Sequence, residues 1–155
     1  MAIKNNPADL ITIALPVRNN EKTVATTINS ILCQTYSNWE LCIVDDASTD
    51  STAKVVEQYK DKRIKFFRHQ KNLHIAKTLN EIVKQANGKY LARIDGDDYC
   101  YPKRLEVQLK FMNEHPDIDL VGSNMLVVNE NGKVVGSRLF PQEHAMICRQ
   151  SYAGI

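Results

Sequence analysis

Three carboxylates crowd into four residues of the stretch YLARIDGDDYCYP, residues 90–102, at Asp95, Asp97 and Asp98. Like charges this close repel one another and lose solvation, so a plain solvated turn does not require them. Closely spaced carboxylates at the end of an apolar segment suit a hard divalent cation, which prefers oxygen ligands and can bridge to a diphosphate. The alternative is a capped helix N-terminus, but one cap needs only one carboxylate.

Polar side chains also follow three other apolar segments, residues 10–17, 39–46 and 64–68. In chain order they are Pro16, Arg18, Asn19 and Glu21; Asp45, Asp46, Ser48 and Asp50; and Lys71, Asn72 and His74. In an open parallel sheet, ligands bind beyond the carboxyl ends of the strands. The four loops are therefore predicted to meet at one edge of a sheet and to form a ligand site there.

Several of these residues have a structural alternative. Ser48 and Asp50 can cap a helix, and Glu21 can stabilise a helix N-terminus through the dipole. Arg18 can be a solvated charge. Arg93, within a strand predicted to be buried, either pairs with a nearby carboxylate or contacts a ligand. The residues alone leave these alternatives open.

The elements that must position these loops follow from apolar periodicity. Strands are predicted over residues 10–17, 39–46, 64–68 and 89–94. Helices are predicted over residues 19–35 with Asn20 as N-cap, over 47–59, over 75–86 before Gly88, and from beyond Pro102 to His115. Alternation of buried strands with helices predicts an α/β fold with a parallel sheet, and Asn131-Gly132 predicts a C-terminal hairpin.

The bulk composition fits one soluble globular domain of 155 residues, 43% of them hydrophobic, with a net charge of +2. Basic residues are scattered, so no nucleic-acid partner is expected. The longest apolar runs are too short to cross a bilayer, and residues 1–9 lack the apolar core of a signal peptide. Residues 1–9 are thus predicted to be a tail and residues 10–155 a domain.

The segments from PVRNNE through VDDASTD to GKYLARIDGDDYCYPKRLEVQ resemble the family 2 glycosyltransferases, from about Leu10 to about Gly136. These are nucleotide-sugar-dependent enzymes with the GT-A fold, a Rossmann-like, mostly parallel sheet with flanking helices. The motifs are specific in combination, although a lone D-x-D is weak. The resemblance implies that Pro16, Val17, Arg18 and Glu21 wrap the nucleoside and that Asp46 recognises the base beside Asp45.

It also implies that Asp95, Gly96 and Asp97 form the D-x-D motif. The first aspartate would face the ribose or metal, and the last would bind the Mn²⁺ or Mg²⁺ that holds the diphosphate. The cation would neutralise charge that develops on the departing phosphate. The full predicted set comprises Pro16, Val17, Arg18, Asn19, Glu21, Asp45, Asp46, Ser48, Asn72, His74, Lys77, Arg93, Asp95 and Gly96 for the substrate, and Asp95 and Asp97 for the metal.

The partners implied are a nucleotide-diphospho-sugar donor, most commonly UDP-linked, and a saccharide or lipid-linked acceptor in cell-surface polysaccharide or lipopolysaccharide synthesis. A cytoplasmic location is expected, at the inner face of the membrane, with peripheral association of the full-length protein. Inversion at the anomeric carbon is expected, with a catalytic base beyond Ile155. The 155 residues are therefore expected to bind the donor but to transfer sugar poorly.

The sequence departs from the family pattern at two positions. It has His74 where relatives often have glycine, and Arg18 where an aromatic ring can stack on the base.

Three other classes compete with this interpretation. A phospho-acceptor signalling domain needs its acidic pair after the first strand, whereas the pairs here follow the second and fourth. A dinucleotide-binding oxidoreductase needs a glycine-rich first turn, which LPVRNNEK lacks. A non-catalytic nucleotide-binding or scaffold module stays open, and a metal-dependent titration with UDP separates it from a transferase.

Overall fold

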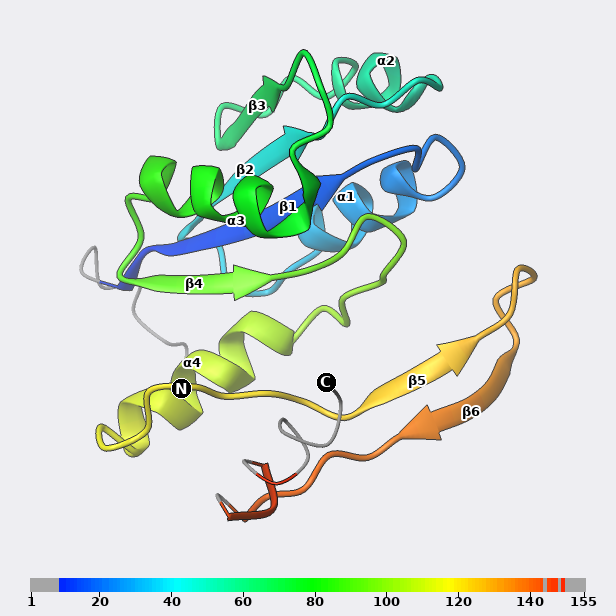
Figure 1. Cartoon of the computed structure of the whole chain (residues 1–155). Helices are drawn as coiled ribbons and strands as arrows, with labels where there is room; N and C mark the ends of the chain where they lie inside the picture. Colours follow the sequence, from blue (N-terminus) through cyan, green and yellow to red (C-terminus); the bar gives the residue numbers. More distant parts are fainter. Residues whose placement is uncertain (1–8, 144, 148, 150–155) are drawn as a thin grey trace. The chain divides into compact units, whose positions relative to one another are not determined.

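The computed structural model describes residues 9–143, 145–147 and 149 (Figure 1). The chain divides into two compact units, Met1–Lys110 and Phe111–Ile155. The elements are β1 (Ile11–Val17), α1 (Val24–Leu32), β2 (Trp39–Asp45), α2 (Thr52–Val56), β3 (Ile64–Arg68), α3 (His74–Gln85), β4 (Tyr90–Arg93), α4 (Arg104–Glu114), β5 (Met125–Val128) and β6 (Val134–Arg138). Of the predicted tail, only Asp9 lies within the described residues.

The first unit is built on a four-stranded parallel sheet in the order β3-β2-β1-β4. Every residue of the two central strands, β1 and β2, is buried. Parallel strands covered on both faces lose the polar alternation of a half-exposed sheet, which explains their nearly continuous apolar sequences. The predicted α/β class and all four predicted strands are confirmed, each to within one or two residues at its ends.

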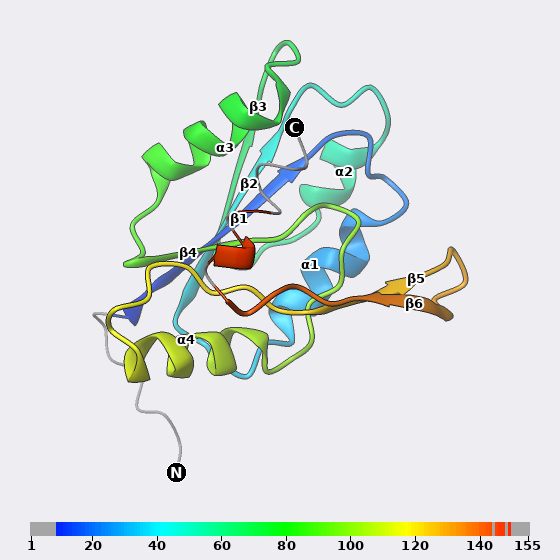
Figure 2. The same cartoon turned by 60° about the horizontal axis from the view of Figure 1, so that its bottom comes forward.

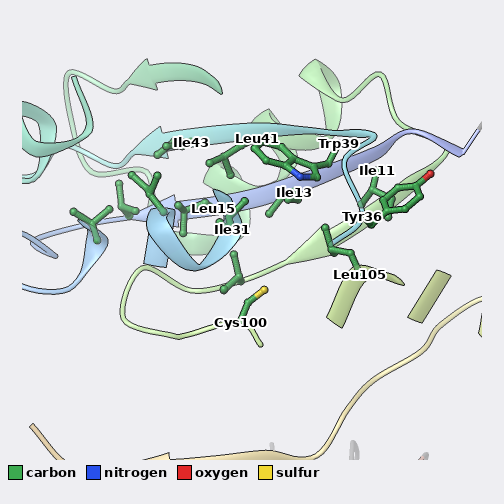
Figure 3. Close-up of a cluster of buried hydrophobic side chains, with 14 of the residues drawn as sticks. Ile11, Ile13, Leu15, Ile31, Tyr36, Trp39, Leu41, Ile43, Cys100 and Leu105 are labelled. Atoms are coloured by element: carbon green, nitrogen blue, oxygen red, sulfur yellow. The ribbon is translucent and has the colours of Figure 1, made fainter. Parts of the chain in front are cut away.

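Helices cover both faces of this sheet: α3 lies on one face and α1 on the other (Figures 1 and 2). Successive side chains of a strand point to opposite faces, so alternate residues join different clusters. Leu15, Leu41 and Ile43 pack with Ile31 of α1 in the larger cluster (Figure 3). Ala14, Cys42 and Val44 pack with Ile82 of α3 on the other face. Each fully buried leucine or isoleucine contributes about 2 kcal/mol of transfer free energy.

Two predicted helix starts are wrong. Helix α1 begins at Val24 rather than directly after Asn20, whose side-chain oxygen accepts the Arg18 backbone N–H at 2.9 Å and so serves the preceding loop. Helix α2 covers only Thr52–Val56: Ala47, at a positive φ of 56°, is not in a right-handed helical conformation, and the Asp50 side chain accepts the Thr52 N–H at 2.9 Å at the helix start. Both loops are therefore longer than the periodicity suggested.

The second unit contains the predicted hairpin, in which β5 and β6 pair antiparallel. Gly132 has a φ of 73° and donates its N–H to the Asn129 carbonyl at 2.9 Å, so the turn uses the left-handed region that favours glycine. A helical turn covers residues 145–147. Among the helices that the structure describes, none has the length and apolar character to cross a membrane.

Candidate functional site

A cleft of about 200 Å³ opens where β1 and β2 end and α3 begins. Its lining residues are Pro16, Val17, Arg18, Asp46, Asn72, His74, Ile75 and Thr78. Six of these eight were predicted from the sequence, and they come from three separate segments of the chain: the end of β1, the end of β2 and the start of α3, with the residues next to them. Ile75 and Thr78 were missed, because helical periodicity marks them as ordinary positions of α3. The carboxyl edge of the sheet therefore carries a cleft, at the place where parallel α/β architecture predicts ligand binding.

Asp46 is the acidic residue of this cleft, and it is only 5% exposed. Its Oδ1 accepts the Leu73 backbone N–H at 2.7 Å and lies 2.9 Å from His69 Nδ1. Burial raises the pKa of Asp46, but these hydrogen bonds outweigh burial and leave the pKa below its usual value. The carboxylate is thus ionised and held in one orientation before any ligand arrives. His69 was missed because nothing local in the sequence links it to a residue 23 positions earlier.

Asp45, the preceding aspartate, does not line the cleft and has no exposed surface. Its Oδ1 accepts the Ser48 backbone N–H at 2.8 Å. Its Oδ2 lies 3.2 Å from Arg68 Nε, which is an ion-pair distance without hydrogen-bond geometry. Arg68 also donates from Nη2 to the Ser48 carbonyl at 2.9 Å. Asp45 therefore shapes the loop after β2 from inside the fold.

The loops after β1 and β2 are cross-linked by hydrogen bonds that run in both directions. Asn19 donates its N–H to Ser48 Oγ at 3.0 Å and accepts the Thr49 N–H at 2.9 Å. Glu21 accepts the Ser51 N–H at 2.9 Å and donates its own N–H to Asp50 at 3.1 Å. Asn19, Glu21 and Ser48, all predicted to bind substrate, thus act in this structure on each other's loops. Contact with a substrate stays a prediction for them.

The acidic turn, residues 95–98, is attached to α1 and lies next to the cleft. The Gly96 carbonyl accepts hydrogen bonds from Thr23 Oγ1 at 2.8 Å and Thr27 Oγ1 at 3.1 Å. Gly96 approaches the cleft residue Val17 so closely that a Cβ atom would lie 3.0 Å from Val17 Cγ1. The turn and the cleft therefore share a boundary at Val17.

Arg93 pairs with Asp95, which confirms the first of the two alternatives for this arginine. Its Nε and Nη2 lie 3.0 and 3.1 Å from the two oxygens of Asp95. Both groups are about half exposed, so this pair adds little stability. Substrate contact by Arg93 and metal binding by Asp95 stay predictions, and a ligand of Asp95 would compete with the guanidinium.

Asp97 has an exposed carboxylate with no hydrogen bond or ion pair to the residues that the structure describes. Burial raises the pKa of its neighbour Asp98, and the charges of Asp97 and Asp95 raise it further. Three carboxylates in one turn suit a cation, although Arg93 pairs with Asp95 and the charge of Arg104 partly offsets that of Asp98. Within the described residues, no group of three or more His, Cys, Asp or Glu side chains forms a complete metal cage. The donor set fits a cation that takes one or two carboxylates here and its other oxygens from a diphosphate and water.

Lys77 is a predicted site residue that the structure does not bring to the cleft. It is exposed on the first turn of α3 and does not line the cleft. The residues of α3 that line the cleft are His74, Ile75 and Thr78, so substrate contact by Lys77 stays a prediction.

The sequence profile of "Glycosyl transferase family 2" matches residues 12–151. The chain belongs to this family. EpsE of Bacillus subtilis (strain 168) is 42% identical to it over 139 residues, which cover 88% of this chain and 50% of EpsE. The UDP-Glc:alpha-D-GlcNAc-diphosphoundecaprenol beta-1,3-glucosyltransferase WfgD of Escherichia coli is 35% identical over 134 residues, covering 86% and 52%. This family 2 chain thus spans about half the length of these curated relatives.

Solved structures confirm the GT-A fold of the family 2 chain. TarS 1-349 of S. aureus, in its crystal structure with UDP, matches with a TM-score of 0.65 and 32% identity, covering 68% of this chain and 32% of TarS. The same protein is also known in complex with UDP-GlcNAc. Membership of the family argues against the phospho-acceptor and oxidoreductase classes.

Proposed function

We propose that this chain is the donor-binding part of a glycosyltransferase that uses a nucleotide-diphospho-sugar, most commonly UDP-linked. The observation that carries the proposal is the adjacency of two features at Val17. On one side lies a cleft with an oriented, ionised Asp46, and on the other lies a turn in which Asp97 has no hydrogen bond or ion pair with the described residues. A nucleoside in the cleft would place its diphosphate towards the acidic turn.

Asp46 would accept a hydrogen bond from a ring N–H of the base. Because its Oδ1 is already fixed by Leu73 and His69, the carboxylate needs no reorganisation when the base enters. Pro16, Val17 and Ile75 give the cleft apolar surface on which a flat base can pack. These residues bind and orient the donor.

Asp97, with Asp95 or Asp98 as a second carboxylate, would hold Mn²⁺ or Mg²⁺ against the diphosphate. When bound, the cation supplies charge neutralisation at the departing phosphate oxygens. Support for a metal comes from the three carboxylates gathered in the turn, of which Asp97 has no ion pair with the described residues. It also comes from a related mannosyltransferase of Pyrobaculum calidifontis, solved with GDP-Man and Mn²⁺ at 25% identity and a TM-score of 0.54. The carboxylates' task is to bring the cation to the donor.

The acceptor would be a saccharide or a lipid-linked saccharide in cell-surface polysaccharide or lipopolysaccharide synthesis. The named activity of WfgD on a diphosphoundecaprenol-linked sugar supports this class. We further propose inversion at the anomeric carbon, with a base contributed by residues of the full-length protein beyond Ile155. The full-length protein would work at the cytoplasmic face of the membrane, by peripheral association.

Calorimetric titration of the 155-residue chain with UDP, with and without Mn²⁺, tests the donor site. We expect Mn²⁺ to strengthen UDP binding at least about tenfold, because the cation links two anions that otherwise repel. Asp97→Asn should abolish the effect of Mn²⁺ and leave metal-free binding unchanged. The control is Asp117→Asn, at an exposed aspartate of the α4–β5 loop, which should behave as wild type.

Failure of UDP, GDP and dTDP to bind in the presence of Mn²⁺ would contradict the proposal and favour a scaffold module. If UDP binds with the same affinity with and without Mn²⁺, the cleft is a nucleotide site but the acidic turn takes no part in binding.

A further inference from the structure

His74, the first residue of α3, has a backbone conformation that residues with a side chain adopt less readily than glycine. Its φ is 65°, in the left-handed region. There a Cβ atom lies too close to the following carbonyl oxygen, whereas glycine, which has no Cβ, adopts the region without this cost. The side-chain oxygen of Asn72 accepts the His74 N–H at 2.9 Å, so the turn before the helix fixes this conformation. A glycine at this position would satisfy the same turn without strain.

Among the residues that the structure describes, two others that are not glycine have positive φ values, and the fold accounts for one of them. Asn19 belongs to a type that tolerates this region, and its side chain accepts the Thr49 N–H. Ala47 carries only a methyl group. The imidazole of His74, in contrast, is exposed and makes no hydrogen bond or ion pair with any residue in the described part of the chain. The fold therefore draws no evident benefit from histidine at position 74.

The imidazole does, however, line the cleft, beside Asp46. Leu73, the residue before His74, donates its N–H to Asp46 Oδ1 at 2.7 Å, which brings the start of α3 against this carboxylate. The cleft thus presents an acceptor, the carboxylate of Asp46, next to a side chain that can donate a ring N–H. Strained residues that the fold does not need are found preferentially where they touch a ligand.

We propose that His74 contacts the donor and selects its nucleobase, by donating a hydrogen bond to a base carbonyl beside the N–H that Asp46 accepts. This inference rests on the proposed nucleotide-binding function of the cleft. Uracil, thymine and guanine each present a ring N–H next to a carbonyl oxygen. Adenine and cytosine present these groups in the reverse order, with an amino donor in place of the carbonyl and a bare ring nitrogen in place of the ring N–H. A base held by its ribose in the same pose would therefore place acceptor against acceptor at Asp46 and donor against donor at His74. The pair therefore favours UDP, dTDP and GDP over ADP and CDP.

The test compares His74→Gly and His74→Ala with wild type in the 155-residue chain, by thermal unfolding and by titration with UDP and ADP in the presence of Mg²⁺. Glycine should raise Tm by roughly 2–4 °C, because it relieves the strain, and should weaken UDP binding at least about tenfold. Alanine should weaken UDP binding equally without raising Tm. Both variants should reduce the preference for UDP over ADP. Asn80→Ala, at an exposed position further along α3, should change none of these quantities.

Two results would overturn the role of His74 while leaving the nucleotide site intact. The first is UDP affinity within twofold of wild type in His74→Gly, and the second is a lower Tm for that variant, which would show that the imidazole supports the fold. Equal affinity of the wild type for UDP and ADP would refute the base selection. Absence of any nucleotide binding by the wild type would instead defeat the proposed function itself.

Discussion

A Cβ atom at Gly96 would lie 2.7 Å from Asn20 Oδ1 and 3.0 Å from Val17 Cγ1. Neither neighbour can move freely, because Asn20 Oδ1 accepts the Arg18 N–H and Val17 is the last residue of a central strand. Gly96→Ala should therefore lower the free energy of unfolding by about 1–3 kcal/mol, as overpacking does elsewhere. Urea unfolding would measure this change.

Gly122→Ala is a matched control, because a Cβ atom there has no neighbour within 4 Å. Combining Gly96→Ala with Asn20→Ala should recover part of the loss, since the closest clashing atom is removed. Equal stabilities of Gly96→Ala and Gly122→Ala would show that the acidic turn is not tightly held against β1.

At the level of elements, the Glu40 side chain links its own strand, β2, to β1, to β3 and to the loop between α3 and β4. These contacts lie at the end of the sheet opposite the cleft. The Glu40 carboxylate accepts hydrogen bonds from Thr12 Oγ1 of β1 at 2.7 Å, Lys65 Nζ of β3 at 2.8 Å, and the Asn87 N–H at 2.7 Å. Burial raises the pKa of Glu40, but these donors outweigh burial and lower the pKa from 4.5 to about 2. The unfolded chain therefore binds a proton at higher pH than the folded one.

Because the folded pKa is the lower one, the stability from Glu40 is complete above pH 4.5 and is lost as the pH falls from 4.5 through about 2. A difference of this size corresponds to about 3 kcal/mol. Glu40→Gln should therefore be clearly less stable than wild type in urea at pH 7, and the gap should shrink by more than half at pH 3. Glu57→Gln, at an exposed position, should cost little at either pH. A gap that does not change with pH would contradict this role of Glu40.

Elements with a strong local signal were predictable, and elements that depend on distant partners were not. The strands β1 and β2 and the Asn131-Gly132 turn could be predicted, because consecutive apolar residues indicate a buried strand and Asn-Gly indicates a tight turn. The sequence around Asn20 is typical of a helix N-cap, yet its side-chain oxygen accepts a hydrogen bond from the Arg18 N–H in the preceding loop. The same limit applies to the site: strand order brings Asp46 to the cleft, whereas its pairing with His69 requires the folded positions of two loops.

Across the whole molecule, the two units differ in how well their backbone is covered. Every residue of β1 and β2 is buried, whereas every residue of β5 and β6 is exposed. An isolated two-stranded hairpin is at best marginally stable. In hydrogen-exchange mass spectrometry, amides of β5 and β6 should exchange within roughly tenfold of an unstructured peptide, and those of β1 and β2 should be protected at least about a thousandfold. Protection of the hairpin equal to that of the sheet would contradict this difference.

The reciprocal hydrogen bonds between the loops after β1 and β2 have a consequence for engineering and for divergence within the family. Each loop satisfies main-chain amides of the other, as Asn19 does for Thr49 and Asp50 does for Glu21. A chimaera that takes only one of these loops from a relative would leave backbone N–H donors of the other loop without their acceptors. The two loops should therefore be exchanged or redesigned together.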